Sequence, residues 1–168
     1  MLSARPILPA ESFMPEGSKA AKAAEGEKMS DVIRLHYDVD GENFTSAGEA
    51  SVNVKKQLRQ MGFPPEVIRR VSIAMYEGEI NMVIHAGGGQ ADVAVAPDKI
   101  EITLTDHGPG IADISLAMKE GYSTAPDHIR SLGFGAGMGL PNMKRYTDSM
   151  KIESAEGEGI TVYMVIVP

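Results

Sequence analysis

The chain has 168 residues, 43% of them hydrophobic, a size that suits one domain with a sizeable core and leaves little room for a second. With 23 acidic and 16 basic residues the formal net charge is −7, which disfavours nucleic acid and anionic membranes as partners. The absence of cysteine excludes disulfides and Cys-based sites, and with no bilayer-length apolar run and no signal-peptide pattern we expect a soluble, cytoplasmic protein.

The first 30 residues differ in character from the rest of the chain. Residues 1–30 mix Pro, Ala, Gly, Glu and Lys without a sustained period, which predicts a flexible N-terminal extension with room for a short helix over residues 18–28. Polar and apolar side chains then alternate over residues 31–39, as they do in a half-buried strand. We therefore place one folded domain at residues 31–168.

Two helices and a hairpin are predicted next. Residues 45–62 have a Thr-Ser pair near their start and a glycine at their end, which favours a helix. Residues 64–89 have a proline in the first turn and three glycines at the end, which favours a second, longer helix. Residues 90–96 and 99–106 alternate as two strands of a hairpin.

A long glycine-rich segment runs from Gly108 to Gly139, with one short helical candidate over residues 112–121. About 30 mostly irregular residues exceed an ordinary connection, so we predict a functional lid. A short helix over residues 140–148 and a hairpin of residues 150–155 and 160–167 complete the domain. The order β-α-α-β-β-lid-α-β-β predicts an α+β fold, a two-layer sandwich whose helices cover one face of a mixed sheet.

The second predicted helix carries a polar pair inside an apolar stripe. Glu77 and Asn81 lie one turn apart, on a helix that is apolar around most of its circumference, where an unpaired carboxylate is costly. Either residue alone is explained if Glu77 reaches solvent or Asn81 bonds to backbone. The pair, followed by glycine-rich segments, instead indicates a phosphate site: an Asn oxygen suits Mg²⁺, and Glu77 can act on a proton near a terminal phosphate.

Two glycine-rich motifs follow this pair. Asp106 ends a predicted strand before Gly108 and Gly110, which is common turn chemistry. A carboxylate there can also accept a hydrogen bond from the exocyclic amine of adenine, while the glycines let backbone approach the base. Residues 133–139 hold alternate glycines before a helix, so free backbone N–H groups can bind phosphates. They complete neither a Walker P-loop nor a dinucleotide fingerprint, so we expect a different nucleotide fold.

In this order and spacing, the motifs resemble those of the GHKL or Bergerat-fold family of ATPases and kinases, which includes gyrase, Hsp90, histidine kinases and MutL. The resemblance implies ATP and Mg²⁺ as cofactors and a mixed, mostly antiparallel sheet with helices on one face. It implies Glu77 as catalytic base, Asn81 as Mg²⁺ ligand, Asp106 as adenine anchor and Thr161 as a second contact near the base. The other nucleotide contacts that it implies are Gly108, Gly110, Gly135, Gly137, Met138, Gly139 and Leu140.

Within that family the segments "EGYST", "GAGMGLPNMKRYTD" and "GEGITV" are similar to small bacterial serine kinases that act as anti-sigma factors or stressosome switch kinases. This implies a serine/threonine protein kinase that phosphorylates a STAS-domain partner, with a sigma factor as a further partner and a homodimer left open. The alternative is a nucleotide-gated binding module without turnover. A stand-alone ATPase is a weaker option, and no segment fits the helical dimerisation domain of a histidine kinase. Residues 125–131 depart from the compact lid of that subgroup.

Overall fold

The computed structural model describes residues 31–168, so the predicted N-terminal extension and its short helix lie outside the described residues. In chain order the elements are β1 (Ile33–Asp40), the 3-10 helix η1 (Phe44–Ser46), α1 (Glu49–Gln60), α2 (Pro65–Ala86), β2 (Gly88–Val95), β3 (Ile100–Asp106), α3 (Ile114–Ala117), α4 (Asp127–Ser131), α5 (Gly139–Arg145), β4 (Ser149–Ala155) and β5 (Gly159–Ile166). Within this part of the chain, none of the helices has the length and apolar character that a bilayer crossing requires.

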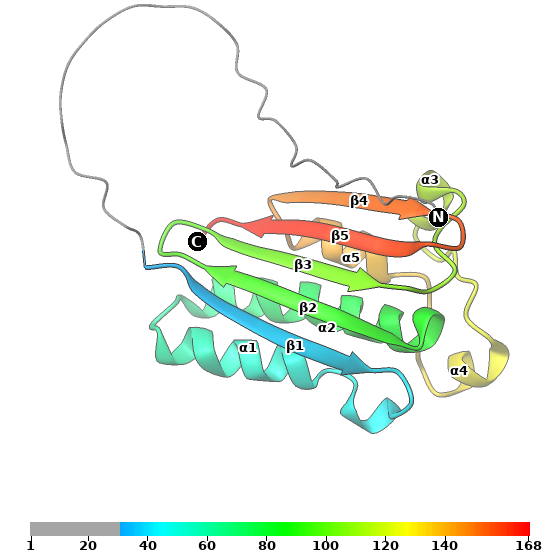
Figure 1. The fold of residues 1–168 in the computed structure, drawn as a ribbon, viewed down its shortest axis with the longest axis horizontal. Helices are drawn as coiled ribbons and strands as arrows, with labels where there is room; N and C mark the ends of the chain where they lie inside the picture. The colour runs from blue at the N-terminus through cyan, green and yellow to red at the C-terminus, as the bar shows by residue number, and fades with distance from the viewer. Residues whose placement is uncertain (1–30) are drawn as a thin grey trace, which may run out of the picture.

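The five strands form one sheet in the order β1-β2-β3-β5-β4, and each neighbouring pair is antiparallel. Figure 1 shows α1, α2 and α5 lying against the same face of this sheet. The predicted α+β sandwich with helices on one face is therefore confirmed, and among the described strands the sheet is antiparallel throughout rather than mixed.

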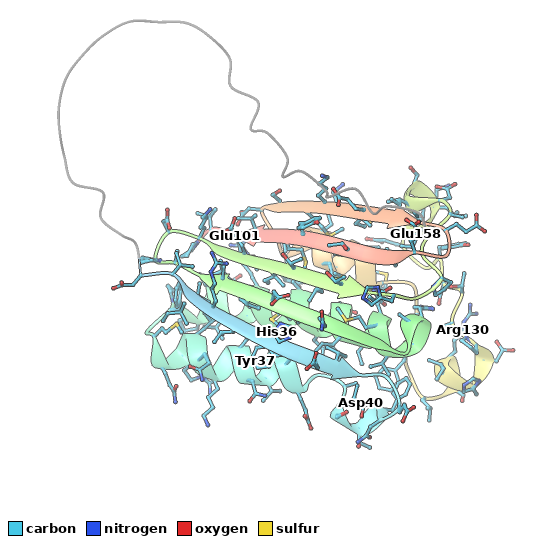
Figure 2. All side chains as sticks on the ribbon, viewed as in Figure 1. His36, Tyr37, Asp40, Glu101, Arg130 and Glu158 are labelled. Carbon is cyan, nitrogen blue, oxygen red and sulfur yellow. The ribbon has the colours of Figure 1, made fainter. Side chains whose placement is uncertain are left out.

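The core lies between the sheet and these helices. Val71, Ala74 and Met75 of α2 are fully buried, and they face strand residues such as Ile100 and Ile102 of β3 that are equally buried. The opposite face of the sheet carries polar side chains in register across the strands, including His36, whose Nδ1 lies 2.7 Å from Asp92 Oδ1 (Figure 2). One face buried and one face polar is the usual pattern of an antiparallel sheet.

Close contact between α2 and β3 depends on the absence of a side chain at Gly78. A Cβ atom at this position would collide with Cδ1 of Leu104, which lies on β3 two residues before Asp106. The helix therefore lies directly against the strand whose end carries the predicted adenine anchor.

A second feature of α2 fixes the start of α1. Glu79 is 1% exposed, and its carboxylate accepts hydrogen bonds from the backbone N–H groups of Ala50 (2.9 Å) and Ser51 (2.8 Å). Gly48, the N-cap residue of α1, has no side chain to make such bonds, so a carboxylate from the neighbouring helix caps α1 instead. Burial raises the pKa of Glu79, and the backbone hydrogen bonds from Ser51 and Ala50 oppose that rise.

The boundaries differ from the sequence prediction mainly around glycine. Of the three glycines expected to end the second helix, only Gly87 does so, in the left-handed conformation at φ 68°. Gly88 and Gly89 already belong to β2, because they pair with Asp40 and Val39 of β1. A side chain at Gly88 would collide with the carbonyl oxygen of Val39. The helix predicted over residues 112–121 is reduced to α3, and α4 forms in a stretch that was predicted to be irregular.

Candidate functional site

A cavity of about 420 Å³ lies beside α2, and its size is typical of a small-molecule site. Its lining comes from α2, from the adjoining ends of β3 and β5, from the lid segment of residues 109–138 and from the start of α5. Most of the residues predicted from the sequence meet here. Those that line the cavity are Glu77, Asn81, Asp106, Gly110, Gly135, Gly137, Met138, Gly139 and Leu140.

Asp106 is held rigidly at one end of the cavity, where it is 8% exposed. Its Oδ1 accepts hydrogen bonds from the backbone N–H groups of Gly108 (3.0 Å) and Ile160 (3.2 Å). These two donors fix the plane of the carboxylate and occupy one oxygen, which leaves Oδ2 to accept a hydrogen bond from a ligand. The geometry suits an acceptor for an exocyclic amine.

Gly108 contributes to the site indirectly. It is not part of the cavity lining; instead it donates its N–H to Asp106, and a side chain there would come within 2.6 Å of Ala86 Cβ on α2. Gly110 lines the cavity at φ 75°, in a left-handed turn where a Cβ atom would collide with the carbonyl oxygen of Ala155. The two glycines thus shape the loop behind and beside Asp106.

Thr161 is the predicted contact that the structure does not bring to the site. Asp106 pairs with Ile160 in the β3–β5 ladder, whereas Thr161 pairs with Thr105 and Glu153. Because side chains alternate between the two faces of a sheet, Ile160 and Val162 line the cavity and Thr161 points to the opposite, polar face. The position beside the base site is therefore occupied by Ile160.

Glu77 and Asn81 lie on the cavity side of α2, next to the start of α5. Glu77 is half-buried, and its Oε1 accepts a hydrogen bond of 2.8 Å from Nδ2 of Asn142, a residue that the sequence prediction did not include. Asn81 faces Gly139, where a Cβ atom would lie 3.0 Å from Asn81 Oδ1. The missing side chain at Gly139 thus leaves the Asn81 amide open toward the cavity.

The glycine-rich end of the lid segment lines the cavity. The N–H of Gly121 donates a hydrogen bond of 2.9 Å to the carbonyl oxygen of Gly137, which lies at φ 75°, so the two ends of the segment 121–137 are tied together. Phe134 lines the cavity and also packs against Phe44 of η1, with ring centroids 5.5 Å apart. The lid segment is therefore closed on itself by the Gly121–Gly137 bond and contacts the rest of the domain through Phe134.

The sequence prediction missed several other lining residues. Lid residues Tyr122, Ser123 and Thr124 line the cavity; they lie in the segment "EGYST", whose resemblance to small serine kinases was noted from the sequence without assigning these residues to the site. His85 also lines it; burial lowers the pKa of this imidazole, and the nearby Asp106 carboxylate partly offsets the effect. A cluster of three or more His, Asp or Glu side chains able to hold a metal is absent from residues 31–168.

Comparisons with known proteins agree with this arrangement. Residues 45–166 match a family described as the histidine kinase-like ATPase domain. The chain is 32% identical over 127 residues to the serine/threonine-protein kinase RsbT of Bacillus subtilis, covering 73% of this chain and 87% of that protein. It is 36% identical over 120 residues to an anti-sigma F factor of Clostridium acetobutylicum, covering 68% of this chain and 80% of that protein.

A solved structure shares the fold. It is the crystal structure of the RsbU and RsbW domains of Rv1364c from Mycobacterium tuberculosis, with a TM-score of 0.56 and 17% sequence identity. The match covers 80% of this chain and 32% of that chain.

Proposed function

The chain belongs to the family of histidine kinase-like ATPase domains, and from that premise we propose that it is an ATP-dependent serine/threonine protein kinase of the anti-sigma or switch-kinase type. The observation that carries the proposal is the single cavity in which a fixed carboxylate, Asp106, and a polar helical pair, Glu77 and Asn81, meet under a glycine-rich lid. Relatives named as a serine/threonine-protein kinase and as anti-sigma F factors support the same reading.

Adenine binds at the Asp106 end. The free oxygen Oδ2 accepts a hydrogen bond from the exocyclic amine of the base, while Oδ1 stays bonded to Gly108 and Ile160. Apolar side chains of Ile160, Val162 and Leu104 line the same end of the cavity and can contact the faces of the base. The phosphates then extend toward the start of α5 and the glycines of residues 135–139, which line the cavity. Backbone N–H groups of such glycines can bind phosphate oxygens.

Mg²⁺ fits the other end of the cavity. Asn81 offers an amide oxygen beside Gly139, where no side chain fills the space, and hard oxygen ligands with phosphate partners are what this ion prefers. When bound, the ion neutralises charge on the phosphates and orients them. The role of Asn81 is therefore to hold the ion against the nucleotide.

Glu77 acts on the protein substrate. Its carboxylate accepts the proton of the serine or threonine hydroxyl as that oxygen bonds to the γ-phosphorus, the bond from the γ-phosphorus to the bridging oxygen breaks, and ADP departs. One oxygen of Glu77 is bonded to Asn142, which leaves the second to take the proton. A protein that only bound nucleotide would not need a carboxylate here.

We propose a STAS-domain regulatory protein as the substrate and a sigma factor as a second, alternative partner in the cytoplasm. The support is the likeness to an anti-sigma F factor and to RsbT. Phosphorylation of the STAS-domain protein would then change which partner the kinase binds. Without turnover, the same cavity and lid would make a nucleotide-gated binding module, and the following experiment separates the two.

The test compares two variants on one helix. Asn81→Ala removes the Mg²⁺ ligand, so it should lower Mg²⁺-dependent ATP affinity as well as turnover. Glu77→Gln keeps the size of the side chain and its acceptor for Asn142, so it should bind Mg-ATP normally and slow phosphotransfer by on the order of 10²-fold or more. ATP affinity by calorimetry and single-turnover transfer to the STAS-domain protein are measured on folded variants. Normal transfer by Glu77→Gln would remove its role as base and favour the binding module.

A further inference from the structure

The hydrogen bond between Glu77 and Asn142 joins two elements that are far apart in the sequence. Nδ2 of Asn142, on α5, donates to Oε1 of Glu77, on α2, over 2.8 Å and across 65 residues. Both side chains are partly buried, and Glu77 also lines the cavity. The next residue, Met143, is 1% exposed and is part of the core, so α5 holds Asn142 at a fixed place relative to α2.

A general base works only when its carboxylate lies within hydrogen-bond reach of the proton that it accepts. A free glutamate side chain samples several rotamers, and holding one of them costs conformational entropy. An amide donor at Oε1 favours one rotamer of Glu77, a side chain that lines the cavity, and leaves Oε2 to accept the proton. Because the amide is neutral, it does this without cancelling the negative charge, which an arginine or lysine in its place would do.

The same short helix also borders the metal ligand. Gly139, the first residue of α5, faces Asn81, and Asn142 lies one turn later and holds Glu77. Residue 139 directly follows the lid. A lid that closes on the phosphates therefore acts on the helix that orients the base.

We infer that Asn142 is the positioning residue for Glu77: it holds the carboxylate in the orientation that receives the substrate proton and links that orientation to the lid end. This rests on the proposed kinase function. Asn142 touches neither substrate nor nucleotide in this role; it acts through Glu77.

The principal test is a double-mutant cycle on single-turnover phosphotransfer from saturating Mg-ATP to the STAS-domain protein. Asn142→Ala should slow transfer by on the order of 10- to 100-fold, the range for a misplaced catalytic group, while ATP affinity measured by calorimetry changes less than about twofold. Lys144→Ala, an exposed position on the same helix, is the matched control and should transfer at the wild-type rate.

The cycle then separates positioning from general weakening of the fold. In the Glu77→Gln background, Asn142→Ala should slow phosphotransfer by less than a further factor of about two, because the side chain that Asn142 orients no longer acts as a base. If the two effects multiply, or if Asn142→Ala lowers ATP affinity as much as transfer, the contact is structural and the inference fails.

Crystallography can test whether Asn142 orients Glu77 without an activity assay. Crystal structures of the wild-type chain and of Asn142→Ala, each with Mg²⁺ and a non-hydrolysable ATP analogue, should show the Glu77 carboxylate in one orientation in the first and displaced in the second. An unmoved carboxylate overturns the inference while the proposed function stands. If the wild-type chain transfers no phosphate, the proposed function fails, and the structures still show whether Asn142 fixes Glu77.

Discussion

Replacing Asp106 with Asn tests the base end of the cavity with little change in shape. The two backbone donors from Gly108 and Ile160 both point at Oδ1, so the carboxamide of the variant should turn its oxygen toward them and its NH₂ group toward the ligand. Adenine presents a donor at its exocyclic amine, and two donors would then face each other. A hydrogen bond to a charged group would be lost and none would replace it.

The size of the effect follows from that loss. A hydrogen bond to a charged group contributes about 1.5 to 3 kcal/mol. Since about 1.4 kcal/mol is a factor of ten in affinity, ATP and ADP should both bind roughly 10- to 150-fold more weakly. The affinities for ATP and ADP should fall by the same factor because the two nucleotides share the same base. The affinity for GTP should fall less than that for ATP, or rise, because the exocyclic oxygen of guanine can accept a hydrogen bond from the new NH₂ group.

Isothermal titration calorimetry on the folded variant measures all three nucleotides. The urea unfolding midpoint should stay near that of the wild type, because the bonds from Gly108 and Ile160 are kept; this is the control for folding. Unchanged affinity for both ATP and ADP would refute the assignment of Asp106 to adenine.

Three other predictions concern the cap of α1, its dependence on pH, and the lid. Glu79→Ala leaves the N–H groups of Ala50 and Ser51 without acceptors in the core, so urea unfolding should show a loss of about 2 to 4 kcal/mol, against little change for exposed Glu49→Ala; a loss below about 1 kcal/mol would contradict the cap. Since burial raises the pKa of Glu79 above its unfolded value, its contribution to stability is greatest below the unfolded pKa and falls as pH rises through the folded pKa, a trend that Glu79→Gln should remove. Mg-ATP should slow amide exchange over residues 111–137 more than ADP does, because the terminal phosphate draws the lid to the cavity; equal exchange with and without ATP would mean that the segment is not a lid.

The elements with a clear period were predictable from the sequence. The alternation of residues 99–106 and the long apolar stripe of the second helix correspond to β3 and α2. Short helices were less predictable: α3 and α4 have four and five residues, too few for a period to be recognised. The start of α3 is instead set by a local cap, in which the Asp113 carboxylate accepts from the N–H of Leu116.

Site residues were predictable where a motif lies within one segment, and not where two segments must be brought together. Glu77 and Asn81 are four residues apart on one helix, so their common face follows from the helical period. Thr161 was misplaced because the face on which a strand residue lies depends on register with Asp106, 54 to 55 residues earlier, and a shift of one residue reverses it. Glu79 and Asn142 were missed because their partners lie on other helices.

The contact between Gly78 and Leu104 constrains how this site can change through evolution. Gly78 lies next to Glu77, and Leu104 lies two residues before Asp106, so their contact sets the spacing between the end of the cavity proposed to bind phosphate and the end proposed to bind the base. A side chain at position 78 would collide with Cδ1 of Leu104, so Leu104 would have to change rotamer or become smaller, or else α2 would move away from β3 and lengthen that spacing. We therefore expect the sizes of the side chains at positions 78 and 104 to vary together among related sequences. A change at one position alone would alter the distance between the two ends of the cavity, and a nucleotide could then not contact both.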